Sequence, residues 1–143
     1  MIDIEAEIDA RAKDLHYLLD LPPPTDPSTV TLRQRQILLV ENVTYYSGGF
    51  RANQPGSRVS GQAYVALTGR PSPSSTVQLG YIHFVDASEV RTPVWDDTRT
   101  LIRTWTDLRF LPQTLEQLRH SQRYFWWGEF PGGHTVSDIH STP

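Results

Sequence analysis

The chain has 143 residues, a formal net charge of -3 and no cysteine. Its length favours a single domain with one core, and its content of hydrophobic (38%) and charged (20%) residues excludes wholesale disorder. The lack of cysteine excludes disulfides, thiolate metal sites and a cysteine nucleophile.

The charge is unevenly spread, because residues 1–20 carry six acidic and two basic residues. The remainder is nearly neutral, which together with a pI near 5.9 argues against a dedicated binder of duplex nucleic acid. The acidic start is unlike a signal peptide, and no long apolar run follows it. These features predict a cytoplasmic protein that does not span a membrane.

The first predicted element is an amphipathic helix over residues 3–20, with Asp3 as its N-cap. Residues 22–31 form a proline-rich connector that ends the helix. Three strands are then predicted over residues 34–46, 58–68 and 76–85, paired as an antiparallel meander.

Glycines inside two of these strands, Gly61 and Gly80, predict bulges or bends and therefore a curved sheet. After the meander, Thr92-Pro93 and apolar residues at three-to-four spacing up to Leu108 predict a second helix. Within that helix, Trp95 and Trp105 are candidates for the core.

A short helix is expected over residues 113–121, followed by an aromatic strand, a Pro-Gly-Gly turn and a weak strand at 134–140. The alternative for residues 134–143 is a frayed tail. The sequence thus predicts one α+β domain over residues 1–143. Its curved antiparallel sheet consists of the meander and a C-terminal hairpin, and the N-terminal helix and two further helices pack on one face of it.

The aromatic strand is the most informative segment, because five large aromatic residues fall within seven positions. They are Tyr124, Phe125, Trp126, Trp127 and Phe130. Successive residues of a strand point to opposite faces, so both faces need cover from a helix, a second subunit, a partner or a ligand. Core packing and a binding interface are both consistent with the pattern, since Trp and Tyr are enriched in both settings.

A second candidate binding segment is the loop predicted from Ser47 to Arg58, where Phe50, Arg51 and Arg58 lie. Arginine side chains hold a carboxylate, a phosphate or an acidic partner well, although an ordinary hairpin connection is the simpler explanation of the loop. Arg123 adds a cation beside the aromatic strand. Interleaved basic and aromatic residues of this kind also stack single-stranded bases, but a wider basic field is missing, so nucleic acid is not the expected partner.

His83 is the candidate for acid/base chemistry, because it follows Leu79 and Tyr81 on one face of a strand. If the curved sheet held a cavity there, a buried imidazole with a lowered pKa would serve as a general base. The simpler interpretation is a core histidine with its hydrogen bonds satisfied.

Two imidazoles and a carboxylate also share one face of the last strand, namely His134, Asp138 and His140. Such a set suits zinc or non-haem iron, whereas a solvated chain end is the simpler explanation. No serine-hydrolase, Rossmann, phosphate-loop or HExxH motif is present, so no cofactor is expected.

These observations favour a small non-catalytic interaction or accessory protein that binds a protein partner, or a second copy of itself, through the aromatic hairpin. The alternative is a small-ligand pocket protein or an acid/base enzyme with its cavity around His83. Metal dependence through the C-terminal histidines is a third hypothesis.

Overall fold

The structure is a computed structural model that describes residues 3–19, 21, 31–51 and 60–142, with side chains for all of these but 48–51, 60–62 and 142. Two α-helices, two short 3-10 helices and seven strands are found in this part of the chain. In chain order they are α1 (Ile4–Leu18), β1 (Gln34–Arg51), β2 (Ser60–Pro71), β3 (Leu79–Val85), η2 (Ala87–Glu89), β4 (Val94–Asp96), β5 (Leu101–Asp107), η3 (Leu108–Phe110), α2 (Leu111–Gln117), β6 (Gln122–Glu129) and β7 (Thr135–Thr142).

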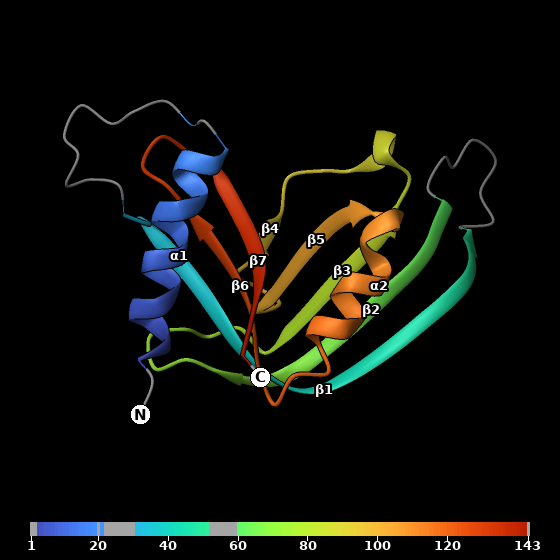
Figure 1. Cartoon of the computed structure of the whole chain (residues 1–143), viewed down its shortest axis with the longest axis horizontal. Coiled ribbons are helices and arrows are strands. Elements are labelled where there is room, and N and C mark those ends of the chain that lie inside the picture. Colours follow the sequence, from blue (N-terminus) through green and yellow to red (C-terminus); the bar gives the residue numbers. More distant parts are fainter. Residues whose placement is uncertain (1–2, 20, 22–30, 52–59, 143) are drawn as a thin grey trace.

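All seven strands belong to one sheet, in the order β4-β5-β3-β2-β1-β6-β7, which curls into a nearly closed barrel (Figure 1). The pairs are antiparallel except β3 and β5, which run parallel. Near one end the two edges meet, because the carbonyl of Pro93 accepts bonds at 3.4 Å from Trp127 Nε1 and Thr135 Oγ1. The predicted fold of a meander plus a hairpin with three helices on one face is therefore wrong.

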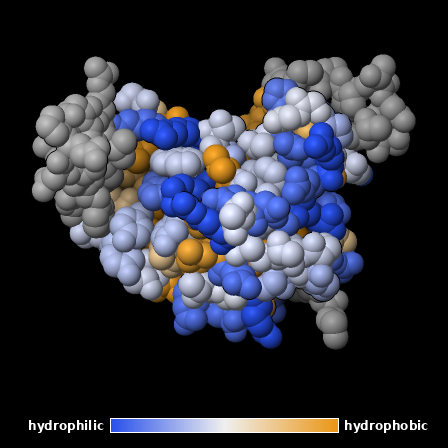
Figure 2. Space-filling model, turned by 180° about the vertical axis from the view of Figure 1, so that it is seen from behind, coloured by the Kyte–Doolittle hydropathy of each residue, from blue (hydrophilic) through white to orange (hydrophobic). Residues whose placement is uncertain are grey.

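The two α-helices pack against opposite faces of the sheet. α1 covers the outer face of β1, β6 and β7, where Ile8 and Ala12 contact Ile37, Trp126 and Val136. α2 and the residue that follows it, Leu118, pack on the inner face of the sheet. There Leu115 and Leu118 join a larger core that is built from the inward-facing residues of the strands. Neither described helix is long and apolar enough to cross a membrane. The face seen in Figure 2 is mostly hydrophilic, with scattered hydrophobic residues.

The segment predicted as a helix over residues 92–108 forms the hairpin of β4 and β5 instead. Its apolar residues fit a helical spacing, but Ile102, Thr104 and Thr106 also alternate with Arg103 and Trp105 at the period of a strand. Ile102, Thr104 and Thr106 are all branched at Cβ, and residues of this kind favour the extended backbone of a strand.

A tight turn explains why the helix does not form. The Asp96 carboxylate accepts bonds at 3.1 Å from the backbone N–H groups of Thr98 and Arg99, which reverses the chain directly after β4. Thr100 then adopts a positive φ of 53°, a left-handed conformation that a helix cannot contain.

Several local predictions are confirmed. Asp3 caps α1 by accepting a bond of 3.2 Å from the N–H of Ala6, and β1, β2 and β3 pair as an antiparallel meander. The short helix is present as α2, and the C-terminal hairpin as β6 and β7. The chain end is a strand paired along its whole length with β6, so it does not fray. Of the predicted connector, residues 22–30 lie outside the described residues.

Candidate functional site

The aromatic run lies in the core. Phe125 and Trp127 point into the barrel, whereas Trp126 points the other way, under α1, and all three are at least 95% buried. Phe130 is buried beside Trp126, and Tyr124 is half-buried at the edge of the same cluster. A helix thus provides the cover for the second face of the strand, and these four buried rings leave little surface for a partner.

Arg123 binds the backbone of neighbouring elements. Its guanidinium donates to the carbonyls of Leu118, Val40 (3.3 Å) and Glu41 (3.0 Å), which ties the end of α2 to the middle of β1. Among the other predicted binding residues, Arg58 lies outside the described residues. Phe50 and Arg51 belong to the end of β1, and their side chains are not described.

His83 lies on the outer face of the sheet, away from the barrel interior. It stands in a row of rings across four strands, since Tyr46, Tyr64, His83 and Trp105 are successive register partners. Tyr46 stacks on Tyr64 at 4.6 Å, and His83 stacks on Trp105 at 5.6 Å.

Burial lowers the pKa of His83 to about 4, and the nearby guanidinium groups of Arg103 and Arg91 act in the same direction. The imidazole is therefore neutral at neutral pH. Its ring contacts other rings on the outer face, and His83 does not line the cavity between β5 and β7, so an acid/base pocket around it stays a prediction.

The three C-terminal candidates for metal binding are not brought together. Asp138 pairs with Arg11 of α1 at 2.8 Å, and His140 Nε2 lies 2.8 Å from a carboxylate oxygen of Glu7. His134 is exposed ahead of β7. In the described part of the chain, no group of three or more His, Asp or Glu side chains is placed to hold a metal ion.

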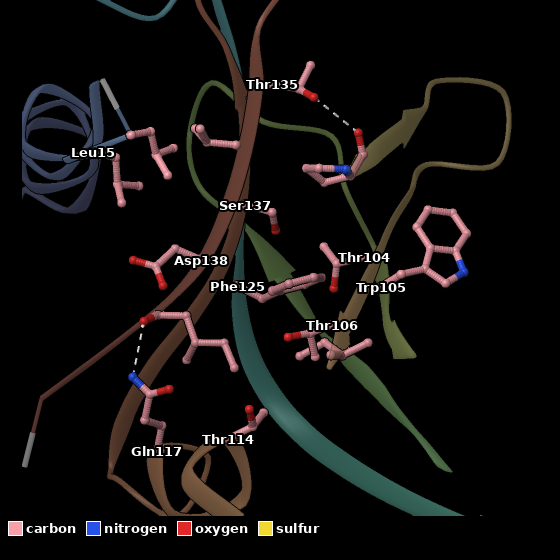
Figure 3. A pocket seen from close by; sticks show the side chains of 15 residues that line it. Leu15, Thr104, Trp105, Thr106, Thr114, Gln117, Phe125, Thr135, Ser137 and Asp138 are labelled. Carbon is pink, nitrogen blue, oxygen red and sulfur yellow. Dashed lines mark hydrogen bonds between the residues drawn. The ribbon is translucent and has the colours of Figure 1, made fainter. Parts of the chain in front are cut away.

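A cavity lies where the barrel fails to close, between β5 and β7 (Figure 3). Its volume is about 340 Å³, at the lower end of the range usual for ligand pockets. α1 contributes Leu15 to its wall, Leu19 follows directly after this helix, and α2 contributes Thr114 and Gln117. The lining consists of Leu15, Leu19, Ile82, Pro93, Thr104, Trp105, Thr106, Thr114, Gln117, Phe125, Thr135, Val136, Ser137, Asp138 and Ile139.

Two walls of the cavity are strand edges. Residues 104–106 of β5 and 135–139 of β7 line it consecutively, although successive side chains point to opposite faces of a strand. Trp105, for example, points away from the cavity in Figure 3, while Thr104 and Thr106 point toward it. The backbone itself therefore forms these walls.

Both edges lack a neighbouring strand in the described structure. β4 pairs with β5 only as far as Arg103, and β7 pairs only with β6. The carbonyl of Ile139 accepts a bond of 3.5 Å from Gln117 on the side away from β6. Since the backbone groups of a strand alternate in direction, those of Ser137 and Thr135 also point toward the cavity.

The lining is neutral in character. Its single charged residue, Asp138, is already paired with Arg11. Phe125 and Ile82 provide an apolar floor, and the hydroxyls of Thr104 and Thr106 have no hydrogen-bond partner among the described residues. The arrangement offers main-chain and hydroxyl groups around an apolar floor, and it lacks an acid/base pair.

Sequence reasoning missed this site because it assigned residues 92–108 to a helix. The signal in the sequence is the pair Thr104 and Thr106, polar residues at alternate positions where the neighbouring strands turn apolar residues inward. Comparisons with protein-family models, with curated proteins and with solved structures found no match.

Proposed function

We propose that this chain is a non-catalytic binding protein that accepts an extended segment of a partner protein as an eighth strand between β5 and β7. The observation that carries the proposal is the cavity with two unpaired strand edges facing each other across it. A segment that adds to a sheet edge gains affinity from main-chain hydrogen bonds, and pockets for alternate side chains supply specificity.

The dimensions define the length of this segment. The five residues of β7 that line the cavity span about 16 Å at a rise of 3.2–3.4 Å per residue. A segment of about five residues therefore fills the opening. Pro93, which closes one end, and Gln117, which caps Ile139 at the other, mark the limits of the site.

The lining defines the chemistry of the segment. Alternate side chains of an added strand would face Phe125 and Ile82 on the inside. On the outside they would face Leu15 of α1 and Leu19, the residue after this helix. Apolar residues on both faces, small on the inner one, suit these walls. The segment needs no charge, because Asp138 is neutralised by Arg11.

The test is selection from a displayed library of seven-residue peptides, followed by titration of the selected peptides. Thr106→Trp fills the cavity from β5, and Thr98→Trp places the same ring on the exposed turn as a control. We expect Thr106→Trp to weaken binding by roughly tenfold or more, equivalent to about 1.4 kcal/mol, and Thr98→Trp to leave it unchanged.

A second variant acts on the backbone alone. Ser137→Pro removes an N–H that points into the cavity, which an edge strand tolerates, and it should abolish peptide binding in a folded protein. If no peptide is selected, or if the selected peptides bind Thr106→Trp and the wild type equally, the proposal fails. If no peptide is selected but a small organic molecule binds the wild type and not Thr106→Trp, the assignment moves to the small-ligand class.

A further inference from the structure

A second open edge lies on β1, away from the cavity. β6 pairs with β1 only from Gln34 to Leu39, whereas β2 pairs with it as far as Arg51. Beyond Leu39 the hairpin of β1 and β2 therefore extends as an arm, seen on the right of Figure 1. Along this arm, the described part of the chain places no strand on the outer edge of β1.

Register shifts lie at both ends of the free stretch, between Val40 and Asn42 and between Ser47 and Phe50, but the stretch between them lacks the features that usually protect an edge strand. From Asn42 to Ser47 the register with β2 is unbroken, so no bulge twists the edge away. This stretch contains no proline and no charged residue, and the carboxylate of the preceding residue, Glu41, lies 3.5 Å from Arg70. Arg123 occupies the carbonyls of Val40 and Glu41, so the free edge begins directly after them.

The exposed side chains of this edge are large. Tyr45 and Tyr46 are 44% and 41% exposed, on opposite faces of the strand. Tyr46 is also the last ring of the outer row that begins at Trp105, so the row stops at the open edge. A strand added there would cover both tyrosines.

We infer that the β1 edge is the interface through which two copies of this chain form a symmetric dimer. An antiparallel pair of identical edges is related by a twofold axis, and the free stretch from Asn42 to Tyr46 can pair with itself about Thr44. With Thr44 at the axis, Val43 faces Tyr45 of the second copy, and Asn42 faces Tyr46. β-Branched and aromatic cross-strand pairs of this kind are favourable, and no like charges oppose each other.

The dimer would join two sheets edge to edge and bring the two outer rows of rings next to each other. Because the interface lies on β1, it leaves the gap between β5 and β7 of each copy open. The inference is therefore independent of the proposed peptide site.

Sedimentation velocity over a concentration series tests whether the chain forms this dimer. We expect a monomer–dimer equilibrium in the wild type. Thr44→Lys places two ammonium groups opposite each other at the axis and should raise the dissociation constant by roughly tenfold or more. The matched control is Thr68→Lys on β2, an exposed threonine in register with Asn42.

Tyr46→Lys serves as a second edge variant, and circular dichroism shows whether each variant is folded. A wild-type protein that stays monomeric at all concentrations would overturn the inference. So would a dimer that Thr44→Lys and Tyr46→Lys leave intact, because a different surface would then hold it. Thr106→Trp, which blocks the proposed peptide site, should leave the dimer unchanged.

Discussion

A Cβ atom placed on Gly80 of β3 would lie 2.5 Å from Cδ2 of Phe125 on β6, although the two strands are not neighbours in the sheet. The ring of Phe125 therefore crosses the barrel interior and rests on the backbone of β3. Gly80 is the residue that makes room for it, and Phe125 in this position forms the floor of the cavity.

Gly80→Ala should lower the free energy of unfolding by about 1–3 kcal/mol, because the added methyl group overlaps a ring that has little room to move. Urea denaturation measures the loss. In the double variant Gly80→Ala/Phe125→Leu the smaller side chain removes the overlap, so the two changes should cost less together than the sum of their separate effects. If the losses of stability in the two single variants simply add in the double variant, the contact between Gly80 and Phe125 does not limit the packing.

Trp126 of β6 and Tyr46 of β1 allow a direct comparison of a core ring with a surface ring. Trp126 is fully buried under α1, so Trp126→Ala should cost about 3–5 kcal/mol of stability. Tyr46 is 41% exposed and mainly contacts the ring of Tyr64, so Tyr46→Ala should cost about 1 kcal/mol. Chemical denaturation of both variants checks the order, and equal losses would contradict the assignment of Trp126 to the core.

His83 should make the protein sensitive to mild acid. Its pKa is about 4 in the folded protein, below the ordinary value of 6.5, because of burial and the charges of Arg103 and Arg91. As the pH falls below 6.5 the unfolded chain takes up this proton first, so stability is complete above that pH and declines toward pH 4.

Melting temperatures between pH 7 and 5 test this expectation, since that range lies above the ordinary pKa of 4.5 for Glu5. His83→Phe should flatten the decline, and His134→Gln, a change at an exposed histidine, should retain it. An NMR titration of the His83 ring with its midpoint near pH 6.5 would contradict the prediction.

The turn before β5 carries backbone strain. Thr100 has a φ of 53°, which is unfavourable for a residue branched at Cβ. Thr100→Gly should therefore raise stability by up to about 1 kcal/mol, because glycine adopts this conformation freely. Thr98→Gly, in the same turn but without a positive φ, should lower stability. Thermal unfolding of both variants tests this prediction. A loss of stability in both would show that the strain at Thr100 is negligible.

Elements with local determinants were predictable from the sequence. The cap of α1 depends on Asp3 and Ala6, and the meander depends on alternation within each strand, so both can be read within a few residues. The fate of residues 92–108 could not be read in this way. Trp95, Ile102 and Trp105 suit both a helical stripe and a pair of strands, and the turn at Asp96 decided between them.

The location of the candidate site was beyond prediction for a different reason. The cavity lies between β5 and β7, which are separated in the sequence by η3, α2 and β6 and are not paired. Its walls are backbone edges, and the sequence carries no side-chain motif for an unpaired edge. The burial of Trp126 likewise depends on α1, which contacts it from the other end of the chain.

The pairing of β1 with β6 also determines when the barrel can form during synthesis. Ile37 and Leu38 lie opposite Trp126 and Phe125, so their partners are translated almost 90 residues later. Until then the ribosome-bound chain can complete the meander, but not the strand that covers the first half of β1. Contacts so distant in sequence slow folding, and an apolar edge left open in the meantime favours aggregation. The early part of this chain is therefore where a nascent-chain chaperone would be most needed.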